Sequence, residues 1–288
     1  MKVDFFIVGA PKAGTTSLYH YLNEHPEIVM SKQKETDYFS DDSLQKQELY
    51  YGKNRINTLE KYHSLFQNAD QKKTGEASVS YLFYEDVPQK IKAYNSNGKI
   101  IIMLRNPVDR AFSHYLMDYR LGLISKSFES ILENEKKDIK TSLFYQQYIE
   151  LGQYSGQVKR YIEKFGKENV TIIFYYDFKN HVVKEVQKVY EFLEVDSKYR
   201  AEIENKHNTY SMPKNNWIRL IYSFVSFRKI LNRILPKRKV RKIKEKLFIK
   251  SKKPKLSDVL RARLINLYAH DIKQLEELLS VDLSQWKK

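Results

Sequence analysis

Residues Phe5–Leu18 read FFIVGAPKAGTTSL, and this stretch indicates the architecture of the chain. Phe5–Val8 is a short apolar run closed by Gly9, which is typical of a buried strand. A glycine-containing loop follows, and Thr15–Glu24 then has the apolar spacing of a helix. Such a turn between a strand and a helix directs backbone N–H groups at an anion, and the helix N-terminus adds its positive end. The stretch predicts a phosphate-binding loop; an ordinary strand-to-helix turn is the alternative.

Strand and helix patterns alternate along the following residues. Further short apolar runs predict strands at Ile28–Met30, Lys99–Leu104 and Val170–Tyr175, and another strand is expected at Thr74–Ser78. Helical patterns are found at Glu85–Tyr94, Pro107–Leu121, Ser155–Phe165 and Asp177–Leu193, where Asp177 is expected to cap the helix. Strands that are apolar throughout and alternate with helices are typical of parallel sheets covered on both faces. We therefore expect an α/β fold with a P-loop-like parallel sheet flanked by helices.

The expected domain organisation is one domain over residues 1–288. Residues 1–200 form its α/β core, and residues 215–288 form a helical C-terminal extension. No strand pattern is found from Trp217 onward, and Leu256–Leu279 has the pattern of a long amphipathic helix.

Composition excludes several classes of protein. With 42% hydrophobic residues the chain can form a core, and the absence of cysteine excludes a disulfide scaffold, a thiolate zinc site and a cysteine nucleophile. No apolar run approaches the ~18 residues of a membrane span, and the N-terminus lacks the pattern of a signal peptide. The expected location is the cytoplasm.

The net charge of +16 is concentrated in one segment. Residues 228–255 contain 14 Lys and Arg and one acid, Glu245, and so carry +13 of that charge. A uniformly basic body that binds nucleic acid is therefore disfavoured.

The phosphate-binding loop differs from that of ATP-binding proteins. Gly9 and Gly14 have the spacing of G-x-x-x-x-G-K-[ST], but Thr15 stands at the lysine position and Lys12 lies inside the loop. The apolar strand that ends at Leu104 is followed by Arg105, which suits a second anion and does not suit Mg²⁺. A kinase for a small metabolite is the less favoured alternative.

Two of these segments together resemble a known family. Pro11–Leu18 resembles the 5′-phosphosulfate loop of sulfotransferases that use 3′-phosphoadenosine-5′-phosphosulfate (PAPS). Arg105–Ser113 resembles their 3′-phosphate site, an arginine followed eight residues later by a serine. A protein that binds PAPS needs two anion sites, and arginine donates two parallel hydrogen bonds to a phosphate.

Further segments resemble the carbohydrate branch of this family, related to the heparan sulfate sulfotransferases. Lys34–Phe39 is similar to K-E-x-x-[FY]-F, and Glu76–Tyr81 is similar to E-K-[ST]-x-x-Y, with Ala77 in place of the lysine. Gly152–Tyr154 matches G-x-Y, and Leu260–Trp286 resembles the C-terminus of bacterial members.

The resemblance implies roles on the donor side. The residues expected to bind PAPS, and the product adenosine 3′,5′-bisphosphate (PAP), are Lys12, Ala13, Gly14, Thr15, Thr16, Ser17, Arg105 and Ser113. Lys12 is also expected to act in catalysis by stabilising the charge that grows on the leaving 5′-phosphate. No metal is expected.

On the acceptor side, Glu35 is expected to be the general base, with Glu76 as the reserve candidate. Without the resemblance, Glu35 would be interpreted as a solvated glutamate. The residues expected near the acceptor are Lys34, Glu76, Tyr154 and Gln157. A core tyrosine is the alternative interpretation of Tyr154.

The expected partner is a saccharide, either lipid-linked or a polysaccharide, that accepts the sulfuryl group on a hydroxyl or an amine. The basic segment 228–255 interleaves apolar residues with cations, as peripheral membrane helices do. It predicts binding to the anionic inner face of a membrane, and the alternative is a patch for an acidic saccharide. A non-catalytic protein that binds nucleic acid or membrane is the third hypothesis.

Overall fold

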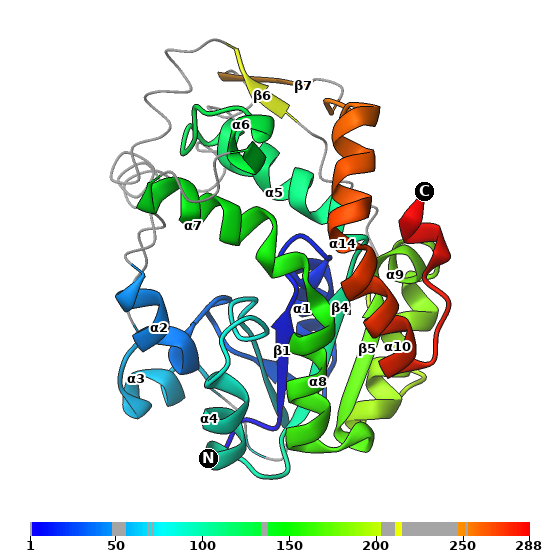
Figure 1. The fold of residues 1–288 in the computed structure, drawn as a ribbon. Helices are drawn as coiled ribbons and strands as arrows, with labels where there is room; N and C mark the ends of the chain where they lie inside the picture. The colour runs from blue at the N-terminus through cyan, green and yellow to red at the C-terminus, as the bar shows by residue number, and fades with distance from the viewer. Residues whose placement is uncertain are drawn as a thin grey trace.

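A five-stranded parallel sheet forms the centre of the protein (Figure 1). The computed structural model describes residues 2–47, 56–67, 70, 72–133, 138–202, 211–214, 247–250 and 253–288. The strands are β1 (Phe5–Gly9), β2 (Ile28–Met30), β3 (Lys73–Ala77), β4 (Lys99–Leu104) and β5 (Val170–Phe174). Their order across the sheet is β2-β3-β1-β4-β5, and every pairing is parallel. The predicted α/β fold class is confirmed.

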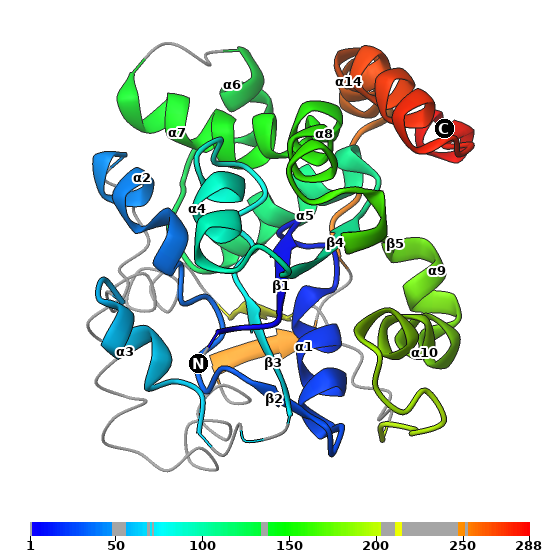
Figure 2. The same cartoon turned by 90° about the horizontal axis from the view of Figure 1, so that it is seen from below.

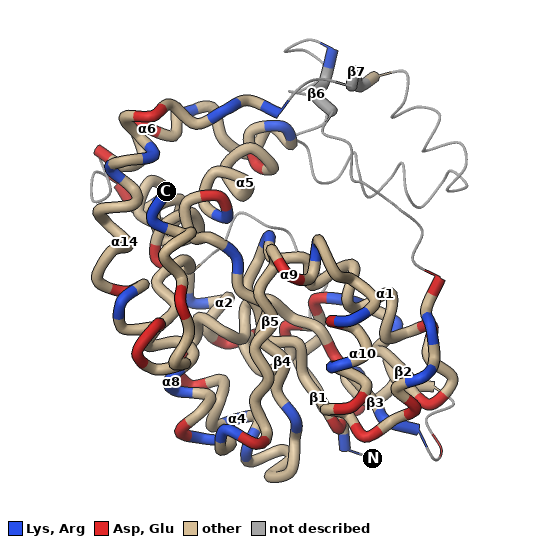
Figure 3. The backbone as a smooth tube through the Cα atoms, turned by 90° about the vertical axis from the view of Figure 1, so that its right-hand side faces the viewer, with Lys and Arg blue, Asp and Glu red and all other residues tan. Residues whose placement is uncertain are grey.

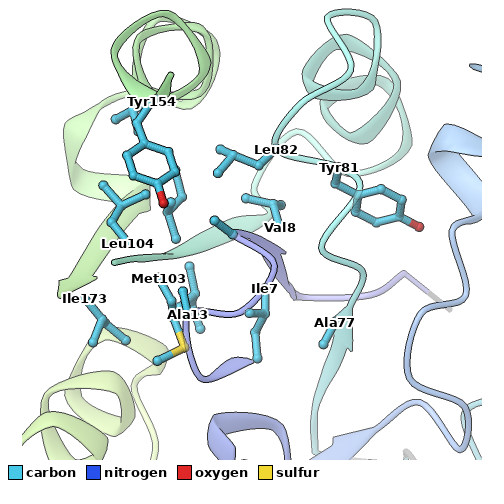
Figure 4. Close-up of a cluster of buried hydrophobic side chains, with 14 of the residues drawn as sticks. Ile7, Val8, Ala13, Ala77, Tyr81, Leu82, Met103, Leu104, Tyr154 and Ile173 are labelled. Carbon is cyan, nitrogen blue, oxygen red and sulfur yellow. The ribbon is translucent and has the colours of Figure 1, made fainter. Parts of the chain in front are cut away.

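The sheet is buried on both faces, which is why β1 and the last five residues of β4 are almost entirely apolar. All five residues of β1 are buried, and so are the last five of β4. Figure 4 shows side chains from four strands, Ile7, Val8, Ala77, Met103, Leu104 and Ile173, in one cluster with Ala13, Tyr81, Leu82 and Tyr154 from the loops and helices that cover the sheet.

Helices cover the two faces of the sheet (Figure 2). The helices α1 (Thr15–Glu24) and α10 (Val182–Leu193) pack together on one face. The helices α4 (Val87–Tyr94) and α8 (Tyr154–Phe165) pack together on the other. Figure 3 shows acidic and basic positions interspersed along α8 and α10, as expected for solvated outer surfaces.

A helical layer lies beside the carboxyl end of the sheet. It consists of α5 (Pro107–Arg120), α6 (Phe128–Glu133) and α7 (Ile139–Tyr148). Asn106 caps α5 by accepting hydrogen bonds from the N–H groups of Val108 and Asp109. Arg110 is fully buried and donates to the carbonyls of Gln147 and Tyr148, so its charge neutralises the negative C-terminal end of α7.

The remaining short elements connect these layers. They are η1 (Tyr38–Ser40), α2 (Asp41–Lys46), α3 (Leu59–His63), η2 (Glu150–Gly152), η3 (Lys167–Asn169), α9 (Tyr175–Asn180) and η4 (Ser284–Lys287).

The long C-terminal helix α14 (Asp258–Leu279) confirms the helix expected there, and it packs against α8 and α5. Its buried face consists of Leu264, Tyr268, Ile272 and Leu275. On the same helix, Asp271 accepts hydrogen bonds from the N–H groups of Tyr154 (2.6 Å) and Ser155 (3.0 Å). The C-terminal helix therefore supplies the N-terminal cap of α8.

Two expectations were wrong. The single helix expected from Asp177 to Leu193 is two helices, α9 and α10, and Asp177 lies inside α9 rather than at a cap. The break is at His181, which leaves the helical region with φ −134° and ψ 48°. A strand also exists beyond Trp217, because β7 (Phe248–Lys250) pairs antiparallel with β6 (Ser211–Pro213). The apolar residues Leu247 and Phe248 were interpreted as part of the basic segment, in which apolar residues interleave with cations, and not as a strand.

Among the described residues, no helix is long and apolar enough to cross a membrane. Residues 228–246, 251 and 252 of the basic segment lie outside the described residues.

The cap from Asp271 leads to a stability prediction. Asp271→Ala removes three acceptor contacts, including one from the Ser155 hydroxyl, and should destabilise the fold by about 1 kcal/mol, the usual cost of losing a helix cap. Urea denaturation measures the change. Glu277→Ala is the matched control, because Glu277 is an exposed acid on the same helix and forms only a 3.9 Å ion pair with Lys273. Equal stability of the two variants would contradict the capping role.

Candidate active site

Three segments meet at the carboxyl ends of three neighbouring strands. At the end of β3, the Ala77 carbonyl accepts a hydrogen bond from the Glu35 N–H at 2.8 Å. Beyond β1 comes the loop that contains Lys12, and beyond β4 comes Arg105, whose Nη1 donates to the Lys12 carbonyl at 3.0 Å. Because β1 lies between β3 and β4, the sheet places Glu35, Lys12 and Arg105 in this order along one edge. This is the edge at which α/β proteins bind their ligands.

The start of α1 is suited to an anion. Gly14 precedes the helix in the left-handed region, with φ 95° and ψ 4°. A Cβ there would lie 3.2 Å from the Tyr175 ring and 3.4 Å from Met103 Cε, so a side chain would be strained and crowded. α1 has neither a side-chain cap nor an acid in its first turn. Its first N–H groups and its positive end therefore suit a phosphate.

The loop residues predicted to bind PAPS differ in exposure. Ala13 and Thr15 have buried side chains, Ser17 is half-buried, and Thr16 is exposed. Ala13 and Thr15 therefore offer their backbone to a ligand, whereas the Thr16 hydroxyl is accessible.

Lys12 is held close to α5. Its Nζ lies 3.4 Å from the Met117 sulfur. Burial, together with the positive charges of Arg120, Arg105 and Lys253, lowers the pKa of Lys12 to about 8, against the opposing effect of Asp118. Several positive charges thus lie close together around Lys12, and a multiply charged anion bound there would be stabilised by them.

Arg105 is restrained on three sides. Its guanidinium lies over the Tyr175 ring at 4.6 Å, and its Nη1 bonds the Lys12 carbonyl. Its own carbonyl accepts a hydrogen bond from the Tyr154 hydroxyl at 3.0 Å. Ser113 is half-buried on α5, one turn before the Met117 that contacts Lys12. The structure thus brings the two predicted phosphate sites together around one loop.

Glu35 follows β2 in a left-handed conformation, with φ 59°. Its Oε2 accepts a hydrogen bond from the Val79 N–H at 2.9 Å, and its Oε1 pairs with Lys34 Nζ. The side chain of Glu35 is 34% exposed and that of Lys34 is 17% exposed. The carboxylate is therefore oriented by the protein and still reachable from solvent.

The other three residues expected near the acceptor are buried. Tyr154 and Glu76 are fully buried, and Gln157 is 5% exposed. Gln157 donates to the carbonyls of Glu150 and Gln153, and Tyr154 bonds the Arg105 carbonyl. Glu76 accepts four hydroxyl hydrogen bonds inside the protein. Their burial argues against direct contact with an acceptor and corrects that expectation, and it supports the alternative of a core tyrosine at Tyr154.

The sequence interpretation missed Tyr175, Arg120 and Lys253. Tyr175 follows β5 at the same sheet edge, and its position after a strand next to β4 was the signal that could have revealed it. Arg120 lies at the end of α5, three residues after Met117. Desolvation and the charge of Arg105 lower the pKa of Lys253, so the end of the basic segment reaches the Arg105 side of the site.

Comparisons with known proteins agree with this geometry. A family model described as a sulfotransferase domain matches residues 2–276, so the chain belongs to the sulfotransferase family. The solved structure of a sulfotransferase from Alicyclobacillus acidocaldarius is similar over the whole of both chains, with 30% identity and a TM-score of 0.74. The prediction of a PAPS-dependent sulfotransferase domain is confirmed at the level of the family.

Curated relatives match over part of their length. The membrane-associated sulfotransferase kil1 of Dictyostelium discoideum is 32% identical over 147 residues, which is 49% of this chain and 29% of that protein. The human heparan sulfate glucosamine 3-O-sulfotransferase 5 is 36% identical over 110 residues, 38% of this chain and 29% of that protein. The chain therefore spans less than a third of these two relatives.

The lowered pKa of Lys12 predicts a pH dependence of PAP binding. A bound phosphate stabilises the ammonium, whereas the free protein loses this proton above a pKa of about 8. The affinity for PAP should therefore be steady below pH 8 and should fall as the pH rises above it. Calorimetric titration with PAP from about pH 7 to pH 10 measures the change.

Two variants separate the contributions to this profile. Lys12→Met should bind PAP more weakly and lose most of the alkaline decline. Arg105→Ala should also bind weakly but should keep the decline. An unaltered decline in Lys12→Met would show that another group causes it.

Proposed function

We propose that this protein transfers the sulfuryl group of PAPS to a hydroxyl or an amine of a saccharide. The observation that carries the proposal is the order of Glu35, Lys12 and Arg105 along the carboxyl edge of β3, β1 and β4. In this row Glu35 would face the acceptor, Lys12 would face the 5′-phosphate that carries the sulfuryl group, and Arg105 would face the 3′-phosphate.

The donor half of the reaction depends on placement and charge. Arg105 and Ser113 would hold the 3′-phosphate, and the loop N–H groups with Lys12 would hold the 5′-phosphate. As the bond from sulfur to the 5′-phosphate oxygen breaks, negative charge grows on that oxygen. The Lys12 ammonium stabilises this charge more than it stabilises the bound substrate, so it should raise the rate more than the affinity.

The acceptor half requires a proton to leave as the new sulfur–oxygen or sulfur–nitrogen bond forms. The Oε1 of Glu35 would take this proton. The Val79 N–H holds Oε2, and Lys34 pairs with Oε1. An acceptor hydroxyl or amine would replace Lys34 at that oxygen, and Lys34 would then remain beside the reacting group as a cation.

The saccharide class is supported by the K-E-x-x-[FY]-F segment and by the names of relatives. These include the human 3-O-sulfotransferase and the mouse bifunctional heparan sulfate N-deacetylase/N-sulfotransferase 1, which is 25% identical over 198 residues, 66% of this chain and 22% of that protein. The first acts on oxygen and the second on nitrogen, according to their names. The proposal therefore covers both kinds of acceptor, either as a polysaccharide or on a lipid carrier.

The role of Glu35 predicts a defined loss of activity. Glu35→Gln should fold normally, bind PAP normally and transfer sulfate at least about a hundredfold more slowly. The assay uses labelled PAPS with a panel of saccharides that includes N-acetylated, N-sulfated and free-amine glucosamine polymers.

Glu163→Gln is the control for this assay, because Glu163 is an exposed acid near the far end of α8. It should keep the full rate. Wild-type turnover by Glu35→Gln would remove Glu35 from the role of base.

We also propose that the protein binds anionic membrane surfaces through residues 228–255, from a cytoplasmic location. The +13 charge of this segment and the membrane-associated relative support this proposal. Near an anionic leaflet each lysine or arginine contributes about 1 kcal/mol. Docking there would bring the enzyme close to acceptors on lipid carriers.

A flotation assay tests the membrane proposal. At low salt the protein should float with vesicles that contain about one third anionic lipid. The fraction that floats should fall as the salt concentration rises, because salt screens the attraction between the basic segment and the lipid. Deletion of residues 228–246 should abolish flotation while PAP still stabilises the protein. Flotation that is unchanged by this deletion, or absent at low salt, would contradict the proposal and favour a patch for an acidic saccharide.

A further inference from the structure

A fully buried carboxylate lies directly behind the proposed base. Glu76 is the fourth residue of β3 and has no exposed surface. Its Oε1 accepts hydrogen bonds from the hydroxyls of Ser78 (2.6 Å), Tyr81 (2.8 Å) and Thr36, and its Oε2 accepts one from Tyr62 (2.6 Å). We call these five residues the Glu76 network. A buried carboxyl group is costly unless it is hydrogen-bonded, and here four donors surround it.

The Glu76 network is hydrogen-bonded to a loop, residues 35–39, that contains strained backbone conformations. Thr36 lies between Glu35, with φ 59°, and Asp37, with φ 52°. Both are non-glycine residues in the left-handed region, which side chains adopt at a cost. Such conformations persist where the surroundings hold them, and they gather at functional sites. Glu76 binds the hydroxyl of the residue between the two strained positions.

Other members of the network hold the backbone of the same loop. The Asp37 N–H donates to Ser78 Oγ at 3.0 Å, and the Phe39 N–H donates to the Tyr81 hydroxyl at 3.2 Å. Ser78 and Tyr81 therefore contact Glu76 and the loop at the same time. The segment that contains Ser78 also supplies the Val79 N–H that fixes Glu35 Oε2. A chain of direct contacts thus leads from Glu76 to the orientation of the Glu35 carboxylate.

Tyr62 adds a separate link. Its hydroxyl bonds Glu76 Oε2, and its ring stacks on Tyr38 at 4.5 Å. Tyr62→Phe would keep the ring and remove only the hydroxyl, so this variant probes the carboxylate without removing a loop contact.

We propose that Glu76 is a positioning residue that holds the loop 35–39 so that Glu35 presents its carboxylate to the acceptor. This inference rests on the proposed role of Glu35 as base. Glu76 itself does not touch the acceptor. A purely structural Glu76 would change stability alone, whereas a positioning Glu76 changes turnover through Glu35.

The first test measures the loop without an acceptor. Hydrogen exchange is followed in wild type, Tyr62→Phe, Ser78→Ala and Glu76→Gln. The amides of Glu35, Asp37, Phe39 and Val79 should exchange at least about tenfold faster in the variants. Tyr268→Phe is the matched control, because Tyr268 is also fully buried and its hydroxyl donates to the Ile149 carbonyl at 2.9 Å. It should leave exchange in this loop unchanged.

The second test measures catalysis with labelled PAPS and the panel saccharide that the wild type sulfates. Tyr62→Phe and Ser78→Ala should lower kcat about tenfold or more, with KM for PAPS and the PAP-induced thermal shift unchanged. Tyr268→Phe should retain the wild-type kcat. In a Glu35→Gln background Ser78→Ala should cause almost no further loss, because both changes act on the same group.

The outcomes separate the two proposals. Full activity of Glu35→Gln overturns the base assignment and this inference with it. If Glu35→Gln is inactive, three results overturn the inference alone: unchanged loop exchange in all network variants, wild-type kcat in Tyr62→Phe and Ser78→Ala, or a full additional loss from Ser78→Ala in the Glu35→Gln background. If Glu76→Gln fails to fold, Tyr62→Phe and Ser78→Ala still decide the result.

Discussion

The hydrogen bond from the Arg105 guanidinium to the Lys12 carbonyl joins the two halves of the proposed donor site. The two residues are distant in sequence but follow adjacent strands, β1 and β4. A ligand with two phosphates needs two cationic sites at a fixed separation, and neighbouring strands of a parallel sheet set that separation. The Tyr175 ring under Arg105 and the Tyr154 hydroxyl on its carbonyl restrict the arginine further.

Mutual repulsion among the cations of this site is the cost of that arrangement. Burial disfavours the charged forms of Lys12 and Lys253; the charges of Arg120, Arg105 and Lys253 add to the effect at Lys12, and that of Arg105 adds to the effect at Lys253. The folded core makes the arrangement possible, because the apolar strands beneath the loop fix the backbone that carries these side chains. An anion that binds there relieves the repulsion, so the same feature that opposes folding favours binding of the donor.

The C-terminal helix contributes to the proposed donor site from a distance. Asp271 of α14 caps α8 at Tyr154, and Tyr154 in turn bonds Arg105. The carbonyl of Trp286 accepts a hydrogen bond from Asn106, which caps α5 just after Arg105. On the acceptor side, the Glu76 network has a comparable position behind Glu35. The groups proposed to react are thus carried by loops, while buried polar contacts of the core hold those loops in place.

Local patterns were sufficient for the strands and the phosphate loop, because an apolar run such as Lys99–Leu104 and a glycine turn act over a few neighbouring residues. They also placed Lys12, Glu35 and Arg105 at strand ends, and the resemblance supplied their roles. The break at His181, the short strand β7 and the burial of Glu76, Tyr154 and Gln157 were not predictable in this way. The pairing of β7 and these three burials depend on which distant residue meets a side chain. A buried glutamate with four hydroxyl partners, Glu76, and a partly exposed glutamate proposed as a base, Glu35, look the same in sequence, and only the packing of the folded chain distinguishes them.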